Sequence, residues 1–293
     1  MLVYLNGEFV SSAEARVPAG DRGLLHGYGF FETFRTSGGK PHHWSFHRRR
    51  LARACATAAL PLPSTFLAND EAKLATTIQH LLRSHGRADA VFRYTVTAGS
   101  TPSPVAGANG TPTELLTLRA LPPIPPREGI ALRVLQLARD SGEWVPRPKS
   151  LNYLNALLGA QELQRRSSEP FEDALFLTRD GGFVVETARQ NIAWIADGRL
   201  CYPDYSLGAV TGTCLEWALA LGCPVKACRA TLDEFAAAEA ILTVNSVRGI
   251  TPVHTVWDAQ DRTTLCALRS AAHPMVISLR QQWDEALAGT ARD

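Results

Sequence analysis

The chain has little lysine, although it is not short of positive charge. Of its 30 lysine and arginine residues only four are lysines, and these are Lys40, Lys73, Lys149 and Lys226. An arginine side chain stays protonated in proteins, whereas a desolvated lysine can lose its proton and act as a nucleophile or a base. Because this sequence uses arginine wherever a positive charge suffices, each lysine is a candidate for a chemical role.

The sequence also lacks the features of several specialised classes of protein. It has no run of about 18 apolar residues, so no transmembrane helix is expected, and its first residues, MLVYLNGEFVSS, do not indicate a signal peptide. The net charge of +2 is too small to indicate a nucleic acid or a membrane surface as a partner. With 45% hydrophobic and 20% charged residues, the 293-residue chain is typical of a soluble globular protein with one large or two medium domains.

The cysteines and histidines do not show the spacing of a disulfide framework or a metal site. The six cysteines form no CxxC pair and lie mostly among apolar residues, which predicts reduced, buried thiols in a cytoplasmic protein. His42, His43 and His47 cluster in the sequence without an HExxH motif or a cysteine partner nearby. We therefore expect no metal site.

A proline-rich segment divides the chain. ALPPIPPREG contains four prolines in ten residues, a composition that favours an extended, semi-rigid connector. We predict a linker at 120–128, between an N-terminal α+β domain at 1–119 and a C-terminal domain at 129–293. A second segment, 98–114, is rich in Gly, Pro, Ser and Thr and is long for a plain connection, so it is a candidate functional loop.

Local patterns predict helices and strands in both parts. In the first part, Asn6-Gly7 marks a hairpin turn, and the segments 47–60 and 70–86 have helical spacing. In the second part, 150–166 is a predicted helix, and alternating apolar residues from 173 to 203 predict successive strands.

Lys149 differs from the other three lysines in its surroundings. It lies in RPKSLNYLNALL, directly before an apolar run with helical spacing, and no acidic residue lies within five positions. Lys40 is in a turn, Lys73 is on the polar face of a helix, and Lys226 is at an exposed strand position. The simplest interpretation of Lys149 is a lysine at a helix start whose charged end reaches water, and the alternative is a desolvated, reactive amine.

Two segments of the second part could bind a charged ligand. Glu186 ends a strand in VVETARQNIAWI, where it could pair with a cationic ring nitrogen or an arginine, or could be an ordinary surface glutamate. In GAVTGTCLEW, Gly212 and Thr213 precede an apolar helix, whose N-terminus could bind a phosphate or simply be capped by threonine.

Two arginine-containing motifs also have alternative interpretations. The turn VNSVRG offers Asn245, Ser246 and Arg248 to an anionic ligand, although Asn, Ser and Gly also favour ordinary turns. The arginines of HRRRLAR, 47–53, point in three directions on a helix, which favours a solvated face over a nucleic-acid patch and leaves one arginine to point inward.

Taken in order, these motifs resemble the fold-type IV enzymes of pyridoxal 5′-phosphate (PLP). This is the class IV aminotransferase family, with branched-chain and D-amino-acid aminotransferases and aminodeoxychorismate lyases. The motifs span nearly the whole chain, and they are YLNGEFV, DRGLLHGYGFFETFR, HRRRL, KSLNYLNALL, VVETARQNIAWI, GAVTGTC and NSVRGITPV. The resemblance implies an α+β fold like that of D-amino-acid aminotransferases, with a smaller N-terminal α/β domain and a larger C-terminal domain that has a barrel-like sheet.

The resemblance also implies roles for individual residues toward the cofactor. Lys149 would form the internal Schiff base with PLP and would then move a proton between substrate and cofactor. Glu186 matches the acid that keeps the pyridine nitrogen protonated, so that the ring acts as an electron sink. The other implied cofactor-binding residues are Arg50 and Ser246 for the phosphate, Tyr153 near the 3′-oxygen, and Gly212, Thr213 and Cys214 in the phosphate loop.

Three departures from the family pattern bear on the ligand and the substrate. Many relatives have Ile-Thr where this chain has Thr213-Cys214, which keeps the backbone donors and leaves open whether Cys214 helps to bind phosphate. The arginine in the VTRG segment of D-amino-acid aminotransferases is Ala98 here, which argues against that specificity. The late turn, NSVRG, is more similar to lyase members, and its arginine would hold a substrate carboxylate. The expected substrate-binding residues are His26, Tyr28, Phe31, Arg93, Asn245 and Arg248.

Two reactions of the family fit these residues, and we favour the first. It is that of 4-amino-4-deoxychorismate lyase, which eliminates pyruvate to give p-aminobenzoate for folate biosynthesis. The second is amino transfer from branched-chain or other amino acids to 2-oxoglutarate. A different class, a non-enzymatic arginine-rich binding protein, would bind no PLP. The resemblance further implies a homodimer, with 98–114 as the candidate loop that a partner contributes.

Overall fold

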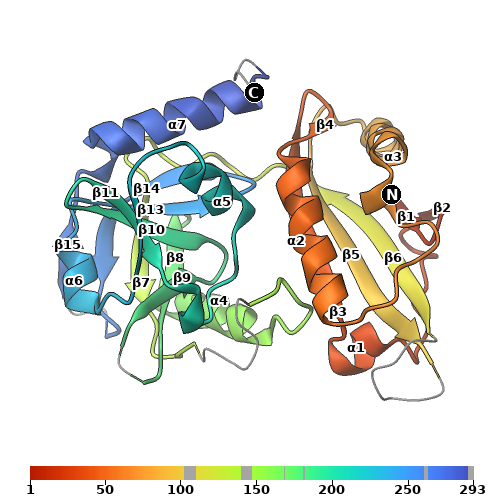
Figure 1. Cartoon of the computed structure of the whole chain (residues 1–293), viewed down its shortest axis with the longest axis horizontal. Helices are drawn as coiled ribbons and strands as arrows, with labels where there is room; N and C mark the ends of the chain where they lie inside the picture. The colour runs from red at the N-terminus through yellow and green to blue at the C-terminus, as the bar shows by residue number, and fades with distance from the viewer. Residues whose placement is uncertain (102–109, 140–146, 168, 181, 261–262, 290–293) are drawn as a thin grey trace. The chain divides into compact units, whose positions relative to one another are not determined.

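The described residues of the computed structural model fall into two compact units (Figure 1). The structure describes residues 1–293 except 102–109, 140–146, 168, 181, 261–262 and 290–293. The first unit contains Met1–Pro122 together with Pro148–Asn152, and the second contains Pro123–Arg147 and Tyr153–Asp293. The domain boundaries at 119 and 129, expected from the sequence, stay a prediction. The contacts within each unit assign the short segment around Lys149 to the first unit.

The first unit is one six-stranded sheet with helices on it. The strand order is β2-β1-β6-β5-β3-β4, and each pair is antiparallel. The elements are β1 (Leu2–Leu5), β2 (Glu8–Ser11), α1 (Arg22–His26), β3 (Gly29–Ser37), β4 (Lys40–Pro41), α2 (Trp44–Thr57), the 3-10 turn η1 (Leu67–Asn69), α3 (Glu71–Ser84), β5 (Val91–Ser100) and β6 (Thr111–Arg119).

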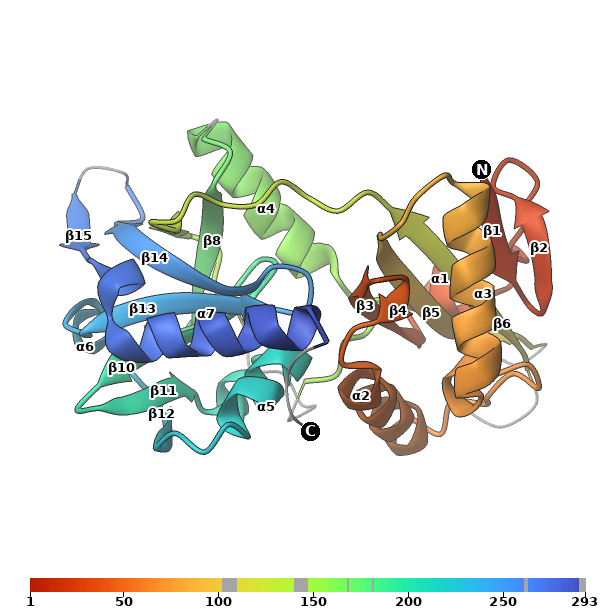
Figure 2. The same ribbon diagram turned by 90° about the horizontal axis from the view of Figure 1, so that it is seen from above.

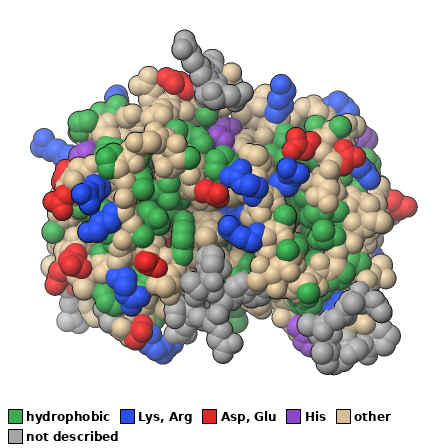
Figure 3. Space-filling view, viewed as in Figure 1, with side chains coloured by type: hydrophobic (Ala, Val, Ile, Leu, Met, Phe, Trp, Pro, Cys, Tyr) green, Lys and Arg blue, Asp and Glu red, His purple; other side chains and the backbone are tan. Residues whose placement is uncertain are grey.

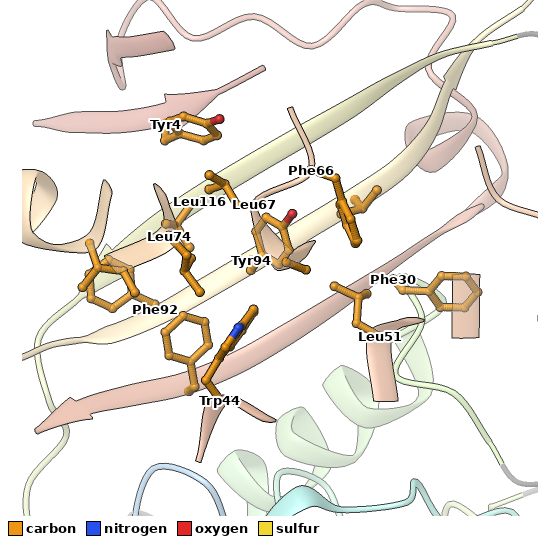
Figure 4. Packing of buried hydrophobic residues seen from close by; sticks show 14 of the residues in the cluster. Tyr4, Phe30, Trp44, Leu51, Phe66, Leu67, Leu74, Phe92, Tyr94 and Leu116 are labelled. Carbon is orange, nitrogen blue, oxygen red and sulfur yellow. The ribbon is translucent and has the colours of Figure 1, made fainter. Parts of the chain in front are cut away.

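Alternation along β5 decides which face of this sheet is covered. Phe92 and Tyr94 are buried in one cluster with Leu51 of α2 and Leu74 of α3, whereas Arg93 between them is exposed (Figure 4). Because successive side chains of a strand point to opposite faces, both helices cover the face of the even-numbered residues. The odd-numbered residues of β3 and β5 lie on the other face.

Lys149 lies in extended chain and not at the start of a helix. Ser150 forms a bridge with Phe30, the backbone N–H of Leu151 donates to the carbonyl of Gly29 at 3.0 Å, and that of Phe31 donates to the carbonyl of Lys149 at 3.0 Å. The predicted helix at 150–166 is therefore wrong in its first residues, because their backbone groups already pair with β3. The helix α4 spans Leu154–Arg166.

The second unit is built on a mixed sheet of nine strands, which curls into a half-barrel (Figure 1). The order is β12-β11-β10-β13-β14-β7-β8-β9, and β15 pairs with β14. Besides α4, its elements are β7 (Ile130–Val134), β8 (Glu172–Leu177), β9 (Val184–Thr187), β10 (Asn191–Ala196), β11 (Arg199–Pro203), η2 (Tyr205–Leu207), α5 (Thr213–Leu219), β12 (Val225–Cys228), α6 (Leu232–Ala236), β13 (Ala240–Asn245), β14 (Gly249–Trp257), β15 (Thr264–Ala267), η3 (Ser270–Ala272) and α7 (Pro274–Leu287).

Burial on both faces makes this sheet the centre of the second unit. In β10, the residues from Ile192 to Ile195 are all buried, and Trp194 packs edge-on against Phe235 of α6. On the other side α7 packs against β14 (Figure 2). Continuous apolar runs of this kind are typical of strands that are covered on both faces.

Several local expectations are confirmed. Asn6 and Gly7, both with positive φ, form the hairpin turn between β1 and β2. The segments 47–60 and 70–86 correspond to α2 and α3, and the region 173–203 contains four strands. Among the described residues, no helix has the length and apolarity needed to cross a membrane. Basic and acidic side chains are interspersed on the face that Figure 3 shows, in keeping with the small net charge.

The glycine that opens β14 fixes the approach of α7 to the turn between β13 and β14. Gly249 has a φ of +71°, and a Cβ at this position would lie 2.2 Å from the indole nitrogen of Trp283 in α7. Gly222, between α5 and β12, also has a positive φ of +80°, but a Cβ there would meet nothing within 4 Å. The two glycines thus share a backbone conformation and differ in crowding.

We expect Gly249→Ala to destabilise the protein more than Gly222→Ala. A left-handed alanine costs about 1–2 kcal/mol, so the free energy of unfolding should fall by about that amount in both variants. In Gly249→Ala the displacement of Trp283 should add roughly 1–3 kcal/mol. Urea unfolding of both variants beside the parent measures the difference, and equal losses would show that Trp283 does not restrict this turn.

Candidate functional site

Lys149 contacts an aromatic ring of β3 that a second cation shares. Its Nζ lies 4.6 Å from the ring centroid of Phe31, and the guanidinium of Arg93 lies 3.6 Å from the same centroid. Phe31 is buried, while Lys149 is half-buried. The negative face of the ring attracts both cations, and the backbone bond from Phe31 to Lys149 fixes where the lysine begins. Three predicted site residues, Lys149, Phe31 and Arg93, therefore come together in the first unit.

Arg50 belongs to a buried charge cluster on the helix-covered face of β3. Its Nε donates to Oε1 of Glu32 at 2.8 Å and its Nη2 donates to Oε2, while Nδ1 of His47 lies 2.6 Å from Oε2. Of the three consecutive arginines in HRRRL, only Arg50 is buried, and Arg48 and Arg49 are exposed. One inward-pointing arginine, which the sequence left open, is thus present.

The charge state of this cluster follows from the balance at Glu32. Burial alone would raise the pKa of its carboxyl, but the Arg50 charge and the hydrogen bonds from His47 and Arg50 outweigh burial and lower the pKa to about 2. Burial lowers the pKa of His47. A neutral imidazole facing a carboxylate must carry its proton on Nδ1, so His47 donates to Glu32.

His26 and Tyr28, also expected to bind the substrate, do not share the surroundings of Phe31 and Arg93. His26 is exposed at the end of α1, and Tyr28 is half-buried. The hydroxyl of Tyr28 donates to the carbonyl of Ala58 at 2.6 Å, and its ring receives the guanidinium of Arg22 at 5.3 Å from the centroid. Tyr28 is therefore held in place by its neighbours in the first unit.

Glu186 is buried in the second unit and has two partners. Arg139 donates to its Oε1 through Nη2, and the backbone N–H of Val210 donates to its Oε2 at 3.0 Å. Arg139 is itself buried, and its Nη1 donates to the side-chain oxygen of Asn155 at 2.7 Å. The interpretation of Glu186 as a surface glutamate is wrong, because its side chain is buried and bonded to a buried arginine and a backbone N–H.

Arg139 is a residue that the sequence reasoning missed. It is one of 26 arginines, and it contacts Glu186 across 47 positions of the chain. Neither spacing nor composition distinguishes it from the others. Only the burial of a glutamate at a strand end, which demands a cation, could have pointed to such a partner.

The predicted phosphate loop lies where α5 begins. Gly212 precedes the helix in extended conformation, Thr213 is its first residue, and both Thr213 and Cys214 are buried. The side chain of Asn191 donates to the carbonyl of Val210 at 2.7 Å, and a Cβ on Gly212 would lie 1.6 Å from its Oδ1. Burial raises the pKa of the Cys214 thiol, which therefore stays protonated.

The late turn is shaped by Asn245. Its side-chain oxygen accepts from the backbone N–H groups of Val247 at 2.9 Å and Arg248 at 2.7 Å. Ser246 and Arg248 are half-buried members of this turn, which ends at Gly249. Asn245 thus acts in this structure as the residue that forms the turn.

The remaining predictions concern Tyr153, the metals and the long loop. Tyr153 directly precedes α4, and its hydroxyl donates weakly to the carbonyl of Ala188 at 3.4 Å. The described residues contain no group of three or more His, Cys, Asp or Glu side chains that could hold a metal ion. Within the candidate loop 98–114, residues 102–109 lie outside the described residues.

A comparison with protein families matches the model described as Amino-transferase class IV to residues 29–256. The matched range covers most of the chain and contains all the predicted site residues except His26 and Tyr28. Two curated relatives align over 262 residues. The aminodeoxychorismate lyase of Bacillus subtilis is 30% identical over 86% of this chain and 85% of its own length. The putative branched-chain-amino-acid aminotransferase of Methanocaldococcus jannaschii is 28% identical over 87% of this chain and 88% of its own.

Solved structures share the fold over nearly the whole chain. The branched-chain aminotransferase of Thermoproteus uzoniensis has a TM-score of 0.81 at 23% identity and covers 100% of this chain and 96% of its own. The 4-amino-4-deoxychorismate lyase of Pseudomonas aeruginosa has a TM-score of 0.78 at 25% identity and covers 97% of this chain and 98% of its own. The predicted α+β fold is confirmed.

Proposed function

Because the chain belongs to the class IV aminotransferase family of PLP-dependent enzymes, we propose that it is a 4-amino-4-deoxychorismate lyase. The observation that carries the proposal is the NSVRG turn, in which Asn245 shapes the backbone that presents Arg248. A guanidinium is the side chain best suited to bind a carboxylate through two parallel hydrogen bonds, and this substrate carries carboxylates. The similarity to the lyase of Bacillus subtilis supports the same choice.

The residues of this chain fit the cofactor of the family. Lys149 offers a half-buried amine beside an aromatic ring, which is the setting that a covalent link to the aldehyde of PLP requires. Glu186 offers a buried carboxyl group that Arg139 holds in place, which suits a partner of the ring nitrogen. Gly212 leaves room for the side chain of Asn191, which lies where a Cβ would be, and Thr213 and Ser246 offer hydroxyls to a phosphate.

The reaction then needs little from the protein beyond binding and one proton transfer. When bound, PLP supplies an electron sink for the carbon that bears the substrate amine. Lys149 would remove the proton from that carbon, and the bond from the ring to the enolpyruvyl oxygen would break as the ring becomes aromatic. The proton would pass to the leaving enolpyruvate, which departs as pyruvate. Arg248 would hold a carboxylate of the substrate, and the carboxyl group of Glu186 would face the ring nitrogen. No amino acceptor is consumed.

We expect Lys149→Ala to remove the visible absorbance of lysine-bound PLP and to lower turnover by about 10²–10⁴-fold, the usual contribution of a positioned acid–base group. Lys73→Ala is the matched control, because Lys73 is exposed on α3. The measurement is an absorbance spectrum of each purified protein after PLP is added, followed by a rate. An unchanged spectrum in Lys149→Ala would reject the assignment of the lysine.

A second candidate is an aminotransferase for branched-chain or other amino acids. It is favoured by the similarity to the Methanocaldococcus jannaschii protein, which covers as much of the chain as the lyase does. Both reactions use an amine, an acid for the ring nitrogen and a phosphate site, so only the substrate contacts distinguish them. Arg248 is the contact on which the two proposals differ.

We expect p-aminobenzoate from 4-amino-4-deoxychorismate without any amino acceptor, and Arg248→Met should raise KM about 10- to 100-fold through the lost charged hydrogen bonds. Arg229→Met is the matched control, since Arg229 is an exposed arginine of the same unit. The parent protein should also be offered branched-chain amino acids with 2-oxoglutarate. Keto-acid formation without p-aminobenzoate would reject the lyase and establish the aminotransferase.

We propose that the protein is a homodimer, because α4 carries an exposed apolar face. Leu154, Leu157 and Leu158 are 66%, 55% and 42% exposed, and their spacing places them on one side of the helix.

The six cysteines are free thiols, which supports the expected cytoplasmic location.

Light scattering after size-exclusion chromatography should give a mass of two chains for the parent protein. Leu154→Glu combined with Leu157→Glu should shift the mass to one chain, because charges placed in an apolar interface are not compensated. Ile277→Glu, on the exposed side of α7, is the control and should remain dimeric. A parent protein of one chain, or a double variant that stays dimeric, would exclude α4 as the interface.

A further inference from the structure

Gln190 forms hydrogen bonds to three parts of the second unit, namely the end of β9, β8 and β13. It has no role in the function proposed above. It is buried in the turn between β9 and β10, four residues after Glu186. The turn is closed locally, since the N–H of Thr187 donates to the carbonyl of Gln190 at 2.9 Å and the N–H of Gln190 donates to the hydroxyl of Thr187 at 2.8 Å. Its side chain is therefore held at a fixed place.

Both the NH2 group and the oxygen of the Gln190 side-chain amide form hydrogen bonds, and these bonds allow only one orientation of the amide. Its Nε2 donates to Oδ2 of Asp173 on β8 at 2.9 Å, and a carboxylate can only accept. Its Oε1 accepts from Nδ2 of Asn245 at 2.9 Å and from the hydroxyl of Thr243 at 3.2 Å, both on β13. Asp173 thus sets the orientation of Gln190.

The orientation of the Gln190 amide in turn favours one orientation of Asn245 in the late turn. Because Nδ2 of Asn245 must donate to Gln190, its Oδ1 faces the other way and accepts from the N–H groups of Val247 and Arg248. A flipped Asn245 amide would place its NH2 group against two N–H donors, which is repulsive. Gln190 and the two backbone N–H groups therefore favour the same orientation of the Asn245 amide, and without an acceptor at Gln190 only the two N–H groups hold it.

We propose that Gln190 is a positioning residue, which fixes the backbone of the 245–249 turn by orienting Asn245. That this turn serves the cofactor phosphate and the substrate carboxylate rests on the proposed function. Gln190 itself touches neither ligand, and it acts through Asn245. Its backbone N–H bonds to Thr187 at the strand end that carries Glu186, and its side chain bonds to Asn245, so one residue connects the strand end with the late turn.

The charged groups that face Gln190 make one substitution informative. Asp173 accepts from Gln190 and also from the hydroxyl of Thr187 at 2.8 Å, and Arg189 of the same turn lies 3.4 Å from Asp173. From β13 only the uncharged Thr243 and Asn245 face it. In Gln190→Glu a protonated carboxyl can still donate to Asp173, whereas an ionised one stands about 3 Å from a second carboxylate and is repelled.

The test is backbone hydrogen exchange of Val247 and Arg248, resolved by NMR, in the full-length protein without PLP. In Gln190→Met, which keeps the length of the side chain and none of its bonds, both amides should exchange about tenfold faster than in the parent. Gln190→Glu should match the parent at about pH 5.5 and match Gln190→Met at about pH 8, each relative to the parent at the same pH. Gln161→Met and Gln161→Glu, at an exposed position of α4, are the controls.

A second readout separates this inference from the proposed function. The apoprotein is titrated with PLP and with pyridoxal, which lacks the phosphate. Gln190→Met should weaken PLP about tenfold more than it weakens pyridoxal, and Gln190→Glu should recover PLP affinity at the lower pH.

The outcomes are distinguishable. Unchanged exchange at Val247 and Arg248 in Gln190→Met, or a pH-independent Gln190→Glu, would overturn the positioning role whatever the ligands do. Faster exchange with equal losses for PLP and pyridoxal would uphold the positioning role and reject the assignment of the turn to the phosphate. Faster exchange with a selective loss of PLP supports both.

Discussion

The need to pair buried carboxylates dominates both units of this protein. Of the buried carboxylates among the described residues, Glu32, Glu172, Asp173 and Glu186 each lie within salt-bridge distance of an arginine, whereas Asp21 and Glu114 accept hydrogen bonds from hydroxyl and backbone N–H groups. An ionised carboxylate with neither kind of partner would cost several kcal/mol or take up a proton. Arginine suits this task better than lysine, because its planar group offers several donors and never loses its charge. The excess of arginine over lysine is therefore explained in part by the arginines that pair with buried carboxylates.

The surroundings of Lys149 differ from those of the arginines that pair with buried carboxylates. Its neighbours are an aromatic ring and a second cation, and its backbone carbonyl accepts from the N–H of Phe31 in β3. A lysine in a helix start would have its position set by the helix alone. Here the position is set by strand pairing across more than a hundred residues of chain, which leaves the flexible side chain as the only moving part.

The features that could be predicted are those whose cause is local in sequence. The turn at Asn6-Gly7 and the helices α2 and α3 follow from a few adjacent residues. The order of the family motifs led to Lys149 and Glu186 as candidate site residues, and their roles stay a prediction. The start of α4 could not be predicted, because the backbone of Ser150 and Leu151 is claimed by β3, which lies far away in the sequence. Arg139 and Gln190 were missed for the same reason. Their partners, Glu186 and Asn245, lie 47 and 55 positions away, and nothing beside either residue marks it.

The distribution of amines has a practical consequence. Lys40, Lys73 and Lys226 are exposed, and Lys149 is the one lysine of the four that is half-buried. Exchange of the three exposed lysines for arginine would conserve the net charge and disturb no buried side chain. The chain is thus three conservative surface changes away from a protein whose only side-chain amine is Lys149, which would then compete only with the N-terminal amine for amine-directed reagents.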